Sequence, residues 1–151
     1  MTKPYDLIGS AKRAMQRDLK LITHIIIHCS DSDFPAHDDV NVIRQWHMER
    51  GFNDIGYHFF IKKDGIIYPC RPLKEMGAHC ITMNMVSVGI CFSGKERFTR
   101  DQFLSGYSLI KSLMNNYKIP KSKVLPHSYF NENKTCPNFA LDEIWELETF
   151  I

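Results

Sequence analysis

Residues 21–30, LITHIIIHCS, constrain the fold of this chain more than any other segment. The three consecutive isoleucines form a β-branched run of the kind that occurs in buried strands. The run ends at His28, and the end of a buried strand is where α/β sheets usually present functional groups. A sheet around this strand needs other strands beside it and helices to cover it.

The rest of the chain alternates between the two kinds of pattern. Helical spacing of apolar residues predicts helices over residues 40–50, from residue 100 to before Pro120, and over residues 141–151. Strands are expected in residues 56–71, 87–94 and 123–125, the first pair as a hairpin around Asp64-Gly65. These interspersed elements predict an α/β fold with a central sheet.

Local signals refine these expectations. Gly51 is placed to end the first helix, and Thr99 with Gln102 matches a capping box at the start of the second. The second helix is expected to bury one stripe of side chains: Phe103, Tyr107, Ile110, Met114 and Tyr117. A further helix can follow Ser10.

Length and composition indicate one domain. The chain has 151 residues, of which 44% are hydrophobic, and we expect an arm at residues 1–20 before a domain at residues 21–151. A net charge of +2 without a basic block argues against nucleic-acid binding. Neither a signal peptide nor a membrane span is recognisable, so we expect a protein that is made in the cytoplasm and is not inserted into membranes. We also expect a monomer.

Cys136, in NKTCPNF, is the residue on which the function depends. It can be a buried thiol, a nucleophile with His127 as its base, or a metal ligand. Together with His28 and His127 it forms a ligand set that suits a catalytic zinc ion with an open fourth position. Separations of 99 and nine residues match no short-range zinc motif, so spacing leaves the choice open.

Two neighbouring side chains bear on the same chemistry. Tyr57 offers a phenol, and alternation along GYHFFIK places it on one face with Phe59 and Ile61. Lys134, two residues before Cys136, offers an ammonium that can stabilise a developing oxyanion. Cys29 follows His28 directly and should point away from the site.

Four segments carry a resemblance to a known family. They are IIIHCS, IRQWHMERGFNDIGYHFFIKKDG, GAHCITMNMVSVGICFSG and PHSYFNENKTCPNF, and they span nearly all of residues 22–145. In this order they resemble the zinc-dependent N-acetylmuramoyl-L-alanine amidases found in the lysozyme of T7-like phages and in peptidoglycan recognition proteins. The resemblance implies a single domain with a mixed sheet flanked by helices.

The resemblance also implies an activity and a site. Members cleave the amide between N-acetylmuramic acid and L-alanine, so the expected partner is bacterial peptidoglycan or its soluble muropeptides. The residues carried over are His28, His127 and Cys136 as ligands of one Zn²⁺, Tyr57 and Lys134 as catalytic groups, and His79 and Asn84 as lining of the substrate groove.

Three alternatives stay open at this point. The chain can be a cysteine hydrolase that uses Cys136, or a module that binds peptidoglycan without cutting it. As an amidase, it can be an endolysin that acts on the cell wall once released, or a cytoplasmic enzyme that recycles muropeptides.

Overall fold

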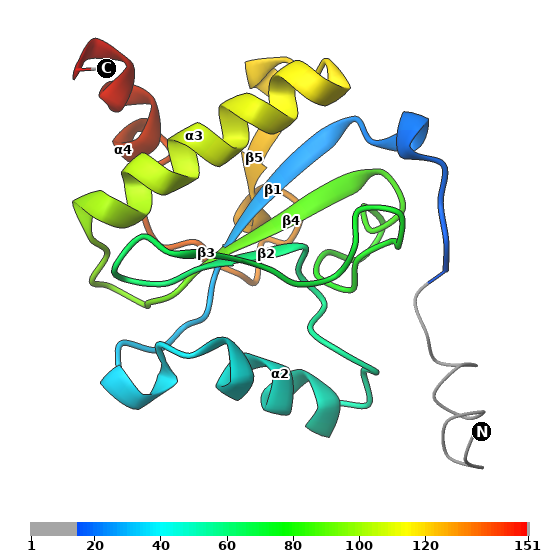
Figure 1. Ribbon diagram of the computed structural model, residues 1–151, viewed down its shortest axis with the longest axis horizontal. Helices are drawn as coiled ribbons and strands as arrows, with labels where there is room; N and C mark the ends of the chain where they lie inside the picture. The colour runs from blue at the N-terminus through cyan, green and yellow to red at the C-terminus, as the bar shows by residue number, and fades with distance from the viewer. Residues whose placement is uncertain (1–14, 151) are drawn as a thin grey trace.

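Strand β1 (His24–Cys29) lies inside a five-stranded sheet of order β3-β2-β4-β1-β5 in this computed structural model, which describes residues 15–150 (Figure 1). It pairs in parallel with β4 (Ser87–Phe92) on one side and β5 (Val124–Pro126) on the other. Strand β2 (Phe59–Ile61) continues the parallel part, and β3 (Ile67–Pro69) is antiparallel at the edge. The sheet is therefore mixed, as expected.

Helices cover both faces of the sheet (Figure 1). Helix α3 (Arg100–Tyr117) and the short α4 (Asp142–Trp145) lie on one face, and α2 (Val40–Glu49) lies on the other. Short 3₁₀ turns complete the fold: Leu19–Leu21, Pro35–His37, Lys121–Lys123, η4 (His127–Tyr129) and Glu146–Phe150. In the described part of the chain, no helix is long and apolar enough to cross a membrane.

Alternation along β1 assigns its side chains to the two faces. Ile25 and Ile27 are fully buried in the larger core cluster, which includes Ile110 of α3. Successive strand residues point to opposite faces, so His28 projects toward the side that α2 covers. The position of this histidine thus follows from the packing of its isoleucine neighbours.

Most local signals in the sequence are confirmed. Gly51 follows α2 with φ +93°, and Thr99 and Gln102 form the reciprocal capping box at the start of α3. The hairpin turn differs in detail, because positive φ occurs at Gly65 and not at Asp64. The Gly65 amide donates to the Lys62 carbonyl, so the turn spans more than the two predicted residues.

The buried stripe of α3 was predicted slightly off its true position. The fully buried positions are Gln102, Gly106, Ile110 and Leu113. A Cβ on Gly106 would come within 2.5 Å of the Phe92 ring, so the glycine allows α3 to pack closely against the sheet at this point. The other predicted residues flank that line and are partly buried against the same core: Phe103, Tyr107, Met114 and Tyr117.

The chain ends differ from the sequence-based expectation as well. The final helix is α-helical over Asp142–Trp145 and then tightens to 3₁₀ over Glu146–Phe150. The helix expected after Ser10 lies outside the described residues. The arm boundary at residue 20 stays a prediction, although the Met15 carbonyl already accepts from the Met76 amide and Gln16 pairs with Glu75.

Arg17 is a buried cation that joins this N-terminal segment to the loop before β4. Its guanidinium donates to four backbone carbonyls at 2.8–3.2 Å: those of Leu73, Asn84, Met85 and Ser87. Burial lowers its pKa to about 10, which still leaves it charged at neutral pH. Carbonyl oxygens thus replace the water that a guanidinium normally requires.

Two further histidines, His47 and His58, are buried and hydrogen-bonded. His47 Nδ1 accepts from the Gly56 amide at 2.8 Å, and His58 Nδ1 accepts from the Gly89 amide at 3.1 Å. His58 Nε2 lies 2.9 Å from the Glu75 carbonyl, to which it must donate. Both rings are therefore neutral members of the core.

Replacing Gln102 with leucine should lower the free energy of unfolding by about 3 kcal/mol. The fully buried amide donates to the carbonyls of Ile61 and Ser93 and accepts from the Thr99 amide. A leucine leaves these groups buried without partners. Urea denaturation measures the loss, and Asn115→Ala, which removes an exposed amide from the same helix, should change stability by less than about 0.5 kcal/mol. Equal effects of the two changes would refute this account.

The free energy of unfolding should fall as the pH drops from 6.5 to about 4. Burial lowers the pKa of both His47 and His58 to about 4, whereas the unfolded chain takes up protons near 6.5. The unfolded state then binds more protons in this window, and each histidine adds a slope of up to about 1.4 kcal/mol per pH unit. Urea titrations across this range should show a shallower slope for His58→Gln, and identical slopes would contradict the assignment.

Candidate metal centre

Parallel pairing of β1 and β5 brings the two histidines together. Ile27 lies opposite Pro126, so the next residues, His28 and His127, leave the same edge of the sheet side by side. Their ring centroids are 4.4 Å apart. A separation of 99 residues in sequence thus becomes a contact through strand register.

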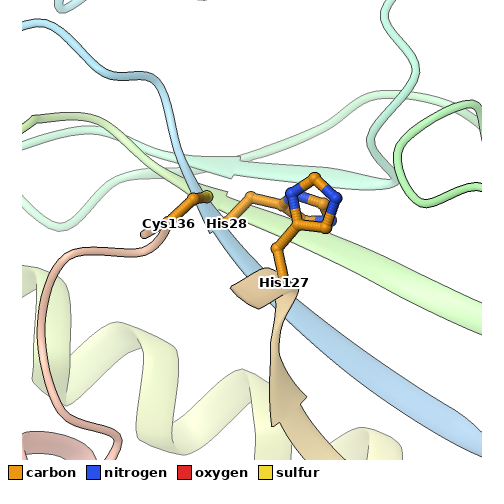
Figure 2. A group of neighbouring side chains, drawn as sticks. All are labelled: His28, His127 and Cys136. Carbon is orange, nitrogen blue, oxygen red and sulfur yellow. The ribbon is translucent and has the colours of Figure 1, made fainter. Parts of the chain in front are cut away.

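Cys136 completes the cluster from the loop that follows η4 (Figure 2). One ligand atom from each of His28, His127 and Cys136 lies within 4.8 Å of the others. The Cys29 amide donates to Cys136 Sγ at 3.0 Å, and the Ser128 amide donates to the Cys136 carbonyl at 3.0 Å. Backbone donors therefore hold the sulfur against the end of β1.

The electrostatic surroundings keep both imidazoles neutral, which is the form that binds metal. His28 is 1% exposed, and burial holds its pKa well below the usual value. Burial and the charge of Lys134 lower the pKa of His127. A hydrogen bond with the Cys29 thiol and burial raise the pKa of Cys136, so this sulfur needs a cation to become a thiolate.

This donor set fits a divalent metal ion. Two neutral imidazoles and one sulfur, converging from three segments, are the protein ligands of one class of catalytic zinc site. The Cys29 thiol is outside this ligand set, although it hydrogen-bonds with the Cys136 thiol, so alternation along β1 does not keep it away from the cluster. Its backbone amide also contacts the Cys136 sulfur, a contribution that side-chain alternation does not predict.

Tyr57 lies beside the cluster, although its predicted face was wrong. Its ring centroid is 5.0 Å from that of His28, and it packs with Phe60 rather than with Phe59 and Ile61. The regular strand begins only at Phe59, so alternation does not extend back to residue 57. Burial, followed by the charges of nearby cysteines, raises the pKa of Tyr57 well above its usual value, so the phenol keeps its proton.

Lys134 lies on the exposed side of the same loop as Cys136. It is close enough to His127 for its charge to lower the pKa of that ring. Lys134 is therefore an exposed cation near the cluster. Its catalytic role stays a prediction.

His79 and Asn84 were expected in a substrate groove, and the structure adds contacts that sequence reasoning missed. His79 Nδ1 lies 2.8 Å from His28 Nε2. Asn84 Oδ1 accepts from the amides of His79 and Cys80, both at 2.9 Å, so it shapes the loop that carries His79. Substrate binding by either residue stays a prediction.

Comparison with known proteins finds relatives over most of the chain. The family model described as N-acetylmuramoyl-L-alanine amidase matches residues 17–139. The endolysin of Escherichia phage T7 is 35% identical over 130 residues, which cover 81% of this chain and 84% of that protein. The endolysin of Klebsiella phage KP32 is 34% identical over 132 residues, covering 82% of this chain and 85% of that protein.

Solved structures give the same result. The N-acetylmuramoyl-L-alanine amidase LysC from Clostridium intestinale superposes with a TM-score of 0.76 at 30% identity, covering 91% of this chain and 92% of that chain. A second match is a Drosophila peptidoglycan recognition protein, a PGRP-LB point mutant in complex with tracheal cytotoxin. Its TM-score is 0.70 at 28% identity, and the alignment covers 83% of this chain and 80% of that chain. The expected single-domain α/β fold is confirmed, and this chain belongs to the N-acetylmuramoyl-L-alanine amidase family.

Proposed function

We propose that this protein hydrolyses the amide between the lactyl group of N-acetylmuramic acid and the L-alanine of peptidoglycan, using one Zn²⁺ held by His28, His127 and Cys136. The convergence of these three ligand atoms within 4.8 Å, in a member of this amidase family, carries the proposal. The protein acts as a monomer.

The chemistry divides between the metal and the surrounding side chains. Zn²⁺, when bound, makes water nucleophilic near neutral pH and polarises a carbonyl group. Tyr57 keeps its proton at neutral pH, so its hydroxyl can donate a hydrogen bond at the reacting centre. Lys134 is exposed beside His127, where its ammonium can reach the carbonyl oxygen of a bound substrate and stabilise its developing negative charge.

The alternative of a cysteine hydrolase is not supported. Within residues 15–150, no hydrogen bond joins His127 to Cys136, the pair that would have to act as base and nucleophile. Cys136 Sγ accepts instead from the Cys29 amide, so a backbone donor and not an imidazole holds this sulfur. The sulfur is therefore better suited to a metal than to direct attack.

The alternative of a module that binds without cutting is also weaker. Such a module needs no complete ligand set, yet both imidazoles and the sulfur are present and close together. Phage endolysins among the relatives favour polymeric cell wall as the substrate, reached once the protein is released from the cytoplasm. Soluble muropeptides are the alternative, and comparing hydrolysis rates on the two substrates distinguishes them.

Removing the metal should abolish activity, and returning Zn²⁺ should restore it. The assay is release of stem peptides from purified cell walls after exhaustive chelation and after addition of one equivalent of Zn²⁺. Cys136→Ser should lose cleavage but still co-sediment with cell walls, because recognition does not require the sulfur. Undiminished activity after chelation, or full activity of Cys136→Ser, would contradict the ligand assignment.

Tyr57→Phe and Lys134→Gln should each lower kcat by about 100-fold while leaving Zn²⁺ affinity unchanged. Each change removes one group that contacts the reacting atoms and leaves the three ligands in place. Lys111→Gln is the matched control, because this lysine lies on α3, which covers the opposite face of the sheet. Steady-state kinetics and chelator competition separate the two effects. A variant with normal kcat would remove that residue from the mechanism.

A further inference from the structure

A chain of three hydrogen bonds runs from a backbone carbonyl to the ring of His28. Ser87 Oγ lies 2.7 Å from the Met83 carbonyl and 3.3 Å from His79 Nε2. At its other side, His79 Nδ1 lies 2.8 Å from His28 Nε2. Once the donor in the first hydrogen bond is known, the donor and acceptor in each of the next two are fixed as well.

The carbonyl at one end sets the direction of the whole chain. A carbonyl can only accept, so the single hydroxyl proton of Ser87 goes to Met83. Ser87 Oγ must then accept from His79, which places the His79 proton on Nε2. His79 Nδ1 is left as an acceptor, so His28 Nε2 must carry the proton and donate it. The unprotonated nitrogen of His28 is therefore Nδ1.

This argument requires each ring to carry one proton. Ser87 is fully buried and His28 nearly so, and within residues 15–150 neither His28 nor His79 hydrogen-bonds to a carboxylate that would favour a second proton. A neutral imidazole has one donor and one acceptor nitrogen.

Two glycines confine the His79 ring. A Cβ on Gly77 would come within 2.3 Å of His79 Cδ2, and a Cβ on Gly89 would lie 2.7 Å from the ring. Neither glycine has a positive φ, so the space for this ring accounts for them better than backbone conformation does. Arg17 adds support by donating to the Ser87 carbonyl at 2.8 Å. The ring therefore has little freedom to turn away from His28.

We propose that His79, directed by Ser87 and the Met83 carbonyl, is a positioning residue that holds His28 in the tautomer with Nδ1 free to bind the metal. The proposal rests on the metal site proposed above and gives His79 a role other than contact with substrate. Partners of this kind fix the orientation of a ligating imidazole and raise its basicity.

The tautomers can be observed directly in the zinc-loaded protein. Long-range ¹H–¹⁵N correlation spectra of histidine-labelled protein identify which ring nitrogen carries the proton. The expected result is a proton on Nε2 of both His28 and His79, with Nδ1 of His28 bound to the metal. Coordination of His28 through Nε2, or a proton on Nδ1 of His79, would overturn the proposal.

Metal affinity gives the second readout. His79→Phe fills the same space without a ring nitrogen and should weaken Zn²⁺ binding by about 10- to 100-fold in chelator competition. Ser87→Ala, a gentler change, should weaken it less and let His79 populate both tautomers. His58→Gln is the matched control, since His58 is a buried histidine beside Gly89 that has no hydrogen bond to His28. It should lower stability but leave Zn²⁺ affinity unchanged.

These outcomes separate the two proposals. Wild-type affinity in both His79→Phe and Ser87→Ala would overturn the positioning role even if the enzyme cleaves cell walls. Expected tautomers and weakened affinities in a protein that releases no stem peptide would instead reject the proposed activity and leave the role of His79 intact.

Discussion

The parallel pairing of β1 with β5 is the contact on which the rest of the site depends. With Ile27 opposite Pro126, the residues that follow on each strand are His28 and His127, and their side chains emerge together at one edge of the sheet. Ile25 and Ile27 of β1 fix this register by packing into the core on the α3 side. A slip of one residue would turn His28 into that core and disperse the ligands.

Buried polar groups, rather than the apolar core, position the loops around this edge. Arg17 donates to backbone carbonyls just before β4, and the Asn84 side chain accepts hydrogen bonds from the amides of His79 and Cys80. The Cys29 amide donates a hydrogen bond to the sulfur of Cys136. Each of these groups would be costly to bury alone, so together they specify one arrangement of the loops. The candidate metal site is thus supported from the sheet, the N-terminal segment and the loop before β4.

Much of this organisation could be predicted from the sequence, because local rules govern it. The β-branched run, the capping box at Thr99 and the glycine after α2 act through neighbours in the chain, and the structure confirms them. The gathering of His28, His127 and Cys136 needed the family resemblance, since strand register is not visible in their spacing. Alternation placed Tyr57 on the wrong face because this residue precedes the regular strand. The contacts of Arg17 could not be foreseen, because they join segments 56 to 70 residues apart through backbone carbonyls. The contact between Ser87 and His79 spans only eight residues, but it depends on how the irregular loop before β4 folds back.

Cobalt titration of the metal-free protein tests the central claim most directly, because Co²⁺ reports on its own ligands. The account predicts saturation at one equivalent, with a thiolate-to-metal charge-transfer absorption that is lost in Cys136→Ser and with weakened binding in His28→Ala and His127→Ala. Failure to bind Co²⁺, or a thiolate band that persists in Cys136→Ser, would show that these three side chains do not share one ion.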